Sequence, residues 1–350
     1  MDRSKLPYNT LSKEELLARL EREKEPREIV SFYKYTSIKD PVTFRDDLYS
    51  SFHKLHILGR IYLAKEGINA QISVPRSSLA AFKKEVIKRF GDIPFKWALA
   101  DDSDAKEPAF IKLIVKVKDK IVADGLDDGS FDPSDTGRHL SAAEFNKALA
   151  QQDTIVVDMR NRYESEVGHF KKAWLPEVDT FREELPLVLE TLKDKKDKKV
   201  LLYCTGGIRC EKASAYMKHH GFTDVNQLSG GIIDYARQVK EEGLENAFIG
   251  RNFVFDERLS EPVTEDIISS CHQCGQKSAR HINCKNDACH LLFIQCNSCQ
   301  KEYEDCCSRE CQEFLTLPAS EQQKKRKELF PKKQGAPIRP RLADGGKTPF

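Results

Sequence analysis

The sequence contains no long apolar run. Its uninterrupted hydrophobic stretches are only a few residues long, whereas a membrane-spanning helix needs about 20 apolar residues. Residues 1–26 are charged and lack the apolar core of a secretory signal. We therefore expect a cytoplasmic protein that has no membrane partner.

An excess of charge of one sign is also missing, and so are the short motifs of several cofactors. The 57 basic and 55 acidic residues leave a net charge of +2, so the overall charge indicates no partner. The chain has neither a G-x-G-x-x-G dinucleotide fingerprint nor an H-x-D sequence that could begin a non-haem iron site. We therefore expect no nucleotide cofactor, and the sequence indicates no oligomeric state.

The order of the predicted elements divides the 350 residues into domains. Residues 1–26 form an extension with one short helix. Residues 27–125 show the order strand, helix, strand, strand, helix, strand, which predicts a ferredoxin-like α+β domain. A turn-rich linker follows at 127–137. Residues 138–245 then alternate strands with helices, which predicts an α/β domain whose largely parallel sheet binds ligands at the carboxyl ends of its strands.

The remaining two pieces are distinguished by their composition. Nine of the 11 cysteines lie in the segment 246–317. Residues 318–350 carry nine Lys or Arg residues against three acidic residues, with Pro and Gly interspersed and almost no apolar content. The segment 318–350 is therefore predicted to be a disordered basic tail.

A cysteine stands where a predicted strand ends and a helix begins. The stretch YCTGGIRCEKASAYM covers residues 203–217, and Cys204 is its second residue. Paired glycines let main-chain N–H groups curve toward the sulfur, while the helix N-terminus and an arginine favour the anion. The pattern predicts a nucleophilic thiolate at Cys204 with a substrate-binding loop made of Thr205, Gly206, Gly207, Ile208 and Arg209.

Both cysteines of this loop have alternative interpretations. Cys204 could be a buried structural cysteine in an ordinary strand-to-helix turn, although Cys-x-Gly-Gly-x-Arg favours the reactive interpretation. Cys210 is either a resolving thiol for a redox-active Cys204 or simply the first helical residue that faces the sheet.

The loop and an upstream stretch resemble the rhodanese superfamily. LLYCTGGIRC is similar to the active-site loop of that superfamily, in which the cysteine carries a persulfide, and DMRNRYESEVGHF is similar to its second signature. Related phosphatases place an arginine six residues after the cysteine, but that place is Cys210 here, which disfavours a phosphoryl substrate. The resemblance implies auxiliary roles for Asp158 and Arg160, either as substrate contacts or as a buried ion pair that tethers the loop.

Further stretches narrow the resemblance to one family. FYKY, LAKEGINAQISVP, VADG, CTGGIRCEKAS, GGIIDYA and FVFDER together resemble the bacterial tRNA wobble-uridine hydroxylases, which combine a ferredoxin-like domain, a rhodanese domain and a cysteine-rich region. The resemblance implies oxygen-dependent formation of 5-hydroxyuridine, with molecular oxygen as co-substrate and the anticodon loop of tRNA as partner. Phosphate contacts would come from basic clusters such as Lys112, Lys116 and Lys118, which share one face of a predicted strand.

The thiolate offers more than one route to chemistry. Attack of Cys204 on uracil C6 would make C5 an enolate carbon that can capture an electrophilic oxygen. The rival hypothesis is a persulfide or sulfenate at Cys204 that acts as a redox group. Two other functions share the same sequence features: a rhodanese-type sulfurtransferase with Cys204 as the persulfide carrier, and a non-catalytic RNA-binding adaptor.

Four short cysteine groups crowd the segment 246–317, namely CHQC, CKNDAC, CNSC and CCSREC. In a reducing compartment such pairs are typical of zinc sites, because each pair supplies half of a tetrahedral ligand set. We expect up to two structural zinc sites, with sequential or interleaved pairing; disulfides, an iron–sulfur cluster and simple packing of thiols are the alternatives. The candidate ligands are Cys271, Cys274, Cys284, Cys289, Cys296, Cys299, Cys306, Cys307 and Cys311.

Overall fold

The computed structural model describes residues 8–23, 25–98, 108–126 and 131–329. The chain divides into two units. The larger unit comprises 1–161, 172–247 and 254–261, and the smaller unit comprises 162–171, 248–253 and 262–350. Within the described ranges, no helix combines the length and the apolar character needed to cross a bilayer.

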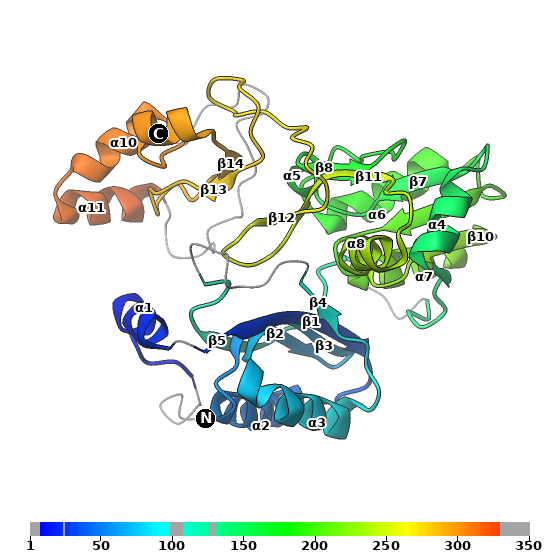
Figure 1. The fold of residues 1–350 in the computed structure, drawn as a ribbon, viewed down its shortest axis with the longest axis horizontal. Coiled ribbons are helices and arrows are strands. Elements are labelled where there is room, and N and C mark those ends of the chain that lie inside the picture. Colours follow the sequence, from blue (N-terminus) through cyan, green and yellow to red (C-terminus); the bar gives the residue numbers. More distant parts are fainter. Residues whose placement is uncertain (1–7, 24, 99–107, 127–130, 330–350) are drawn as a thin grey trace. The chain divides into compact units, whose positions relative to one another are not determined.

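The first part of the larger unit is a five-stranded sheet with two helices on one face (Figure 1). The strand order is β4-β1-β3-β2-β5, in which β1 pairs antiparallel with β3 and β4, β2 pairs antiparallel with β3, and β5 joins β2 in parallel. Its elements are α1 (Lys13–Arg22), β1 (Arg27–Tyr35), α2 (Pro41–Lys54), β2 (Leu58–Ala64), β3 (Gly67–Pro75), the 3₁₀ turn η2 (Arg76–Ser78), α3 (Leu79–Phe90), β4 (Lys96–Trp97) and β5 (Leu113–Val117).

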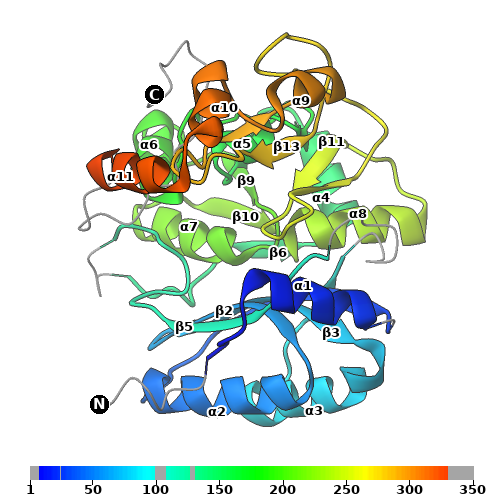
Figure 2. The ribbon, with the colours of Figure 1, turned by 90° about the vertical axis from the view of Figure 1, so that its left-hand side faces the viewer.

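Local sequence explains why these elements form. Asp40 caps α2 by accepting from the N–H groups of Val42 and Thr43, as the Asp-Pro pair predicts. The helices α2 and α3 pack on the same face of the sheet (Figure 2), where Phe32 of β1 meets Phe82 of α3. The ferredoxin-like order of elements is confirmed. The fourth strand of that order along the chain is β4, and β5 is an additional strand at the opposite edge of the sheet.

The second part of the larger unit is the expected parallel α/β sheet. Its four strands lie in the order β6-β10-β9-β7, and all three pairings are parallel. Helices α6 and α7 pack on the face that presents Val200 and Leu202, and α4 contacts the opposite face through Phe145 and Tyr203. The elements are β6 (Arg138–Leu140), α4 (Ala142–Leu149), β7 (Ile155–Asp158), α6 (Phe181–Leu192), β9 (Lys199–Tyr203), α7 (Ile208–His219), β10 (Asp224–Leu228) and α8 (Gly231–Glu242).

The smaller unit combines the cysteine-rich region with a segment taken from the middle of the chain. In it, β8 pairs antiparallel with β11, so residues 162–171 associate with the downstream unit, although they lie inside the predicted range 138–245. A short antiparallel hairpin of β13 and β14 lies among the cysteine groups, with Cys284 and Cys289 in its loop. The elements are α5 (Arg162–Ser165), β8 (Gly168–Phe170), β11 (Phe248–Phe253), β13 (His281–Asn283), β14 (Leu292–Ile294), α9 (Asn297–Tyr303), α10 (Arg309–Thr316) and α11 (Ala319–Leu329). The division of the chain between the two units falls within β12 (Ser260–Pro262).

The basic tail differs from the prediction in its first part. Residues Ala319–Leu329 form the helix α11, whereas the sequence predicts disorder from residue 318 onward. This stretch, ASEQQKKRKEL, is made almost entirely of good helix formers. Pro318 directly precedes it, and all the other Pro and Gly residues that suggested disorder follow it. The rest of the predicted tail, 330–350, lies outside the described residues.

Candidate active site and metal centres

Cys204 follows the central strand β9 directly and precedes the first turn of α7. Its side chain is buried, with 1% of its surface exposed. The main-chain N–H of Gly207 donates a hydrogen bond to Cys204 Sγ at 3.1 Å. The loop therefore curls around the sulfur and points a main-chain donor at it, which is the arrangement that stabilises an anion.

The two glycines of the loop are not equivalent. Gly207 has φ +95°, and a Cβ at this position would lie 2.8 Å from the hydroxyl oxygen of Tyr33. Gly206 has no such constraint, because a Cβ there would lie in ordinary contact, 3.8 Å from Lys96 Cδ. The need for glycine in this loop thus rests on Gly207, both for its left-handed backbone and for the close approach of Tyr33.

The start of α8 supports the loop from behind. The N–H of Ile232 donates to the carbonyl of Cys204 at 3.0 Å, and the N–H of Ile233 donates to the carbonyl of Thr205 at 3.2 Å. Gly231 lets these main chains approach, since a Cβ there would lie 2.5 Å from the Cys204 carbonyl oxygen. The GGII stretch therefore fixes the backbone of the cysteine loop.

The two thiols of the loop have opposite protonation preferences. Burial raises the pKa of Cys204, but a hydrogen bond from the Cys210 thiol, the charge of Arg209 and the N–H groups of Cys210 and Arg209 outweigh burial and lower the pKa to about 6. Burial and the neighbouring Cys204 raise the pKa of Cys210 well above its ordinary value. These surroundings favour the anion at Cys204 and the protonated thiol at Cys210.

Arg209 lies in the first turn of α7, and the Asp158–Arg160 pair stands at the end of β7, the parallel neighbour of β9. Arg209 is buried, its Nη2 lies 3.4 Å from Thr205 Oγ1, and its guanidinium carbon lies 5.8 Å from the ring centre of Phe255. Asp158 ends β7 and binds Arg160 through two hydrogen bonds of 2.8 and 2.7 Å. Both members of this pair are fully buried, so the geometry favours the tethering role over substrate contact.

In the smaller unit, eight cysteines form two groups of four. The sulfur atoms within each group all lie within 4.8 Å of one another. The first group is Cys271, Cys274, Cys296 and Cys299, and the second is Cys284, Cys289, Cys307 and Cys311. The pairing is interleaved. The chain passes through the first half of the first group, the first half of the second group, the second half of the first group and finally the second half of the second group. Cys306, one of the nine predicted ligands, belongs to neither group.

The sulfur separations suit one tetrahedral ion in each group. Zinc–sulfur bonds of about 2.3 Å place the corners of a tetrahedron about 3.8 Å apart. The observed distances are 3.6 Å for Cys274–Cys296, for Cys289–Cys307 and for Cys307–Cys311. A disulfide would require about 2.05 Å, and an iron–sulfur cluster would separate thiolates bound to different irons. The donor set therefore fits a single thiophilic ion such as zinc.

Comparison with known proteins decides the family. Three family models match successive parts of the chain: a UPF0176 acylphosphatase-like domain over 27–121, a rhodanese-like domain over 141–238 and a rhodanese C-terminal region over 249–312. A tRNA uridine(34) hydroxylase of Leptospira interrogans is 54% identical over 322 residues, which are 91% of this chain and 87% of that protein. The chain belongs to the tRNA uridine(34) hydroxylase family.

Other members of the hydroxylase family are similarly close. The tRNA uridine(34) hydroxylase of Photorhabdus laumondii is 50% identical, and the match covers 97% of this chain and 96% of that protein. The tRNA uridine(34) hydroxylase of Yersinia pestis is 53% identical, and the match covers 91% of this chain and 90% of that protein. A solved rhodanese-like domain from Anabaena is 17% identical, with a TM-score of 0.26, and covers 32% of this chain and 78% of its own. The family resemblance seen in the sequence and the three-part fold class are confirmed.

The stretches that resemble the hydroxylase family meet at the cysteine loop. From FYKY in β1, the Tyr33 hydroxyl donates to Glu211 Oε1 at 2.7 Å, and the Tyr35 hydroxyl lies 3.4 Å from the carbonyl oxygen of Ile208. His139 Nε2 lies 3.0 Å from the same Glu211 oxygen. The ferredoxin-like sheet therefore contacts α7 directly beside Cys204, which the sequence motifs alone did not show.

A buried charge cluster joins three of these hydroxylase-family stretches. Lys212, from the CEKAS stretch of α7, binds Glu66 of LAKEG at 2.8 Å and also the carboxylate of Asp124 of VADG. Lys120 donates to Asp124 Oδ1 at 2.7 Å. The side chains of Lys212 and Asp124 are almost fully buried. Sequence analysis missed this cluster because its members lie in distant segments of the chain.

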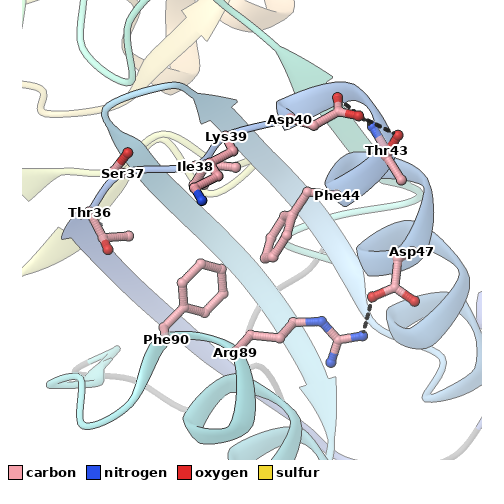
Figure 3. Close-up of a pocket in the computed structure, with 10 residues that line it drawn as sticks. All are labelled: Thr36, Ser37, Ile38, Lys39, Asp40, Thr43, Phe44, Asp47, Arg89 and Phe90. Carbon is pink, nitrogen blue, oxygen red and sulfur yellow. Dashed lines mark hydrogen bonds and ion pairs between the residues drawn. The ribbon is translucent and has the colours of Figure 1, made fainter.

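A separate cavity of about 530 Å³ lies in the ferredoxin-like domain of this hydroxylase-family chain, between the β1–α2 connection and the end of α3 (Figure 3). Figure 3 shows that Arg89 points toward Asp47, with which it forms a 2.7 Å ion pair. Asp40 also lines the cavity and is engaged in capping α2. Because Arg89 is paired with Asp47 and Asp40 caps the helix, both groups are already engaged, and none of the lining residues belongs to the cysteine loop.

Proposed function

We propose that this chain catalyses oxygen-dependent 5-hydroxylation of uridine 34 of tRNA, with the Cys204 thiolate as the nucleophile and molecular oxygen as co-substrate. The observation that carries the proposal is the setting of Cys204: the cysteine follows a strand end, an N–H donor lies 3.1 Å from its sulfur, and its surroundings lower its pKa to about 6. The name shared by relatives that are 50% to 54% identical supplies the substrate.

The chemistry follows from the electron distribution of uracil. Its C6 is electrophilic because the C5–C6 double bond is conjugated to the C4 carbonyl. Addition of the Cys204 sulfur to C6 moves the electron pair of that double bond toward C5 and O4, so C5 becomes nucleophilic and can bond to an electrophilic oxygen. With molecular oxygen as its source, one oxygen atom enters at C5, and an external two-electron donor reduces the other atom to water. Arg209, next to the thiolate, is suited to orient an anionic part of the RNA.

The direct test is nucleoside analysis of tRNA from a strain that lacks the protein. Complementation with the wild-type chain should restore 5-hydroxyuridine at position 34, and Cys204→Ser should not. A gain of sulfur instead of oxygen at that uridine would establish the sulfurtransferase alternative, and full activity of Cys204→Ser would establish the adaptor. Recovery of a covalent complex between Cys204 and tRNA that carries 5-fluorouridine at position 34 would support attack at C6 over a persulfide or sulfenate.

The proposed tRNA substrate requires phosphate contacts. Lys116 lies in the edge strand β5, Lys112 directly precedes that strand and Lys118 directly follows it, and all three side chains are exposed. Their even spacing matches the alternation of side chains in an extended chain, which favours one shared face. Such contacts release counterions, so the affinity for tRNA should fall steeply as the salt concentration rises. A Lys112→Ala, Lys116→Ala, Lys118→Ala triple variant should weaken tRNA binding and reduce the slope of log affinity against log salt.

We also propose that each four-cysteine group holds one structural zinc ion. The interleaved groups lie in a unit with short strands and a small core, which an ion bound by four thiolates would stabilise. Metal analysis of gently purified protein should give two zinc ions per chain, one for each group. A preparation with neither zinc nor iron would refute the proposal.

A further inference from the structure

A buried lysine from the ferredoxin-like domain lies beside the cysteine loop. Lys96 is in β4, which contacts α8, and only 2% of its surface is exposed. Among the residues that the structure describes, none accepts a hydrogen bond from its ammonium group. A buried ammonium without an acceptor has a high desolvation cost, so it calls for a ligand or a function.

The surroundings of Lys96 locate its ammonium group. The side-chain stem faces the loop, where Cδ lies 3.8 Å from the position that a Cβ of Gly206 would occupy. The ammonium nitrogen lies 4.1 Å from the ring centre of Tyr33, whose hydroxyl approaches Gly207. The lysine is thus held over the loop by an aromatic face, with its donors unused.

The charged and titratable groups that face Lys96 come from three elements. They are Tyr33 of β1, Glu211 of α7 and Asp234 of α8. Cys204, in the loop between β9 and α7, is the fourth such group. Burial lowers the pKa of Lys96 to about 8, against the opposing effects of Asp234, Cys204 and Glu211. Lys96 is therefore able to give up a proton near neutral pH, as a general acid must.

We propose that Lys96 is a catalytic residue that donates to O4 of the target uracil when Cys204 adds to C6. This inference rests on the proposed function, since it assigns a second group to the same reaction. The ammonium would supply the positive charge at the place where negative charge develops, in a site from which water is excluded.

The addition step balances without an oxidant. Cys204 gives an electron pair to C6, the pair of the C5–C6 bond forms the C4–C5 double bond, and the carbonyl pair moves to O4, which takes the proton from Lys96. In reverse, the neutral amine of Lys96 takes that proton back, a solvent proton adds to C5, the original C5 proton leaves to solvent and the C6–S bond breaks. Without oxygen, the net result is exchange of the C5 hydrogen with solvent.

This exchange provides the test. Full-length protein and tRNA are incubated in D2O without oxygen, and the fragment that contains uridine 34 is analysed by mass spectrometry for gain of one deuterium. Wild-type protein should catalyse the exchange, and Lys96→Met should slow it about 100-fold, the usual range for loss of a general acid. Lys54→Met, at an exposed lysine of α2, is the matched control and should exchange at the wild-type rate.

The pH profile distinguishes catalysis from a structural role. In wild-type protein, exchange should rise as Cys204 ionises near pH 6 and fall as Lys96 loses its proton near pH 8. Lys96→Arg, whose guanidinium stays charged, should keep part of the rate and lose the alkaline limb. Lys96→Met should fold at least as stably as wild type, because it removes a buried charge without a hydrogen-bonded partner.

The outcomes separate the two proposals. Exchange by Cys204→Ser at the wild-type rate would overturn the nucleophile and the proposed function with it. If Cys204→Ser loses exchange while Lys96→Met exchanges at the wild-type rate, the role of Lys96 alone is overturned. The same holds if the pH profile of exchange by wild-type protein has no alkaline limb. Slow exchange in Lys96→Met with unchanged tRNA affinity and stability would establish the role.

Discussion

At the scale of single residues, the active loop depends on a few close approaches. The pKa of Cys204 is lowered because one thiol, one guanidinium and main-chain N–H groups outweigh the effect of burial. Gly207 allows this arrangement, since its backbone is left-handed and the Tyr33 hydroxyl occupies the space of a side chain. Small changes at this loop should therefore have large effects on chemistry and smaller effects on the rest of the fold.

The two glycines provide a matched pair of variants. Gly207→Ala should lower hydroxylation strongly and destabilise the protein by about 1–3 kcal/mol, because a strained backbone and a clash with Tyr33 are introduced together. In Gly206→Ala the new Cβ makes only an ordinary contact, so hydroxylation and stability should both fall much less than in Gly207→Ala. Thermal unfolding and tRNA hydroxylation assays check the pair, and equal losses in both variants would contradict the assignment.

The lowered pKa of Cys204 predicts its reactivity toward alkylating reagents. The thiolate is the reactive form, so the alkylation rate should rise through pH 6 and level off above it, whereas an ordinary cysteine continues to gain reactivity up to about pH 8.5. Because only 1% of Cys204 is exposed, the plateau rate should be low. Peptide mapping after a short iodoacetamide pulse measures both effects, and a midpoint above pH 8 would contradict the thiolate.

At the scale of elements, the contacts between domains explain what sequence reasoning could and could not reach. The strand-to-helix turn at Cys204 was predictable, because its glycines, its arginine and the flanking apolar run are all local in the chain. The approach of Lys96, Tyr33 and Glu66 to the loop was not, since Lys212 and Glu66 are 146 residues apart and only the folded sheet brings them together. A motif such as LAKEG signals a family, but its physical role as a partner of Lys212 becomes visible only in three dimensions.

The buried cluster around Lys212 therefore allows a prediction at this scale. Lys212→Met would leave the carboxylate of Asp124 buried with Lys120 as its remaining cation, and Glu66 would lose its ion pair with Lys212 while it keeps the hydrogen bond from the Ile121 N–H. Removing one member of a buried ion pair usually costs about 3–5 kcal/mol, so the free energy of unfolding should fall by that amount. Urea denaturation measures it. Lys199→Met, at a surface lysine 3.9 Å from Asp224, is the control and should change stability by less than about 1 kcal/mol.

At the scale of the whole molecule, the chain combines one unit with ordinary apolar cores and one unit organised around thiols. The sequence predicted nine candidate ligands and left the pairing open, because spacing along the chain is compatible with both sequential and interleaved sites. The three-dimensional grouping selects the interleaved arrangement and excludes Cys306 from both groups. In this arrangement the chain between Cys274 and Cys296 contains Cys284 and Cys289, so each group encloses part of the other.

Interleaving predicts that the two proposed zinc sites are lost together. In Cys299→Ser, release of the first ion would free the chain segment that carries Cys284 and Cys289, so the second ion should bind more weakly as well. The zinc content should then fall from two ions per chain to below one, and protease cleavage within residues 262–317 should become faster. Cys306→Ser should keep both ions. Loss of a single ion from Cys299→Ser, with the second retained at full affinity against a chelator, would show that the groups are independent and that their interleaving carries no energetic coupling.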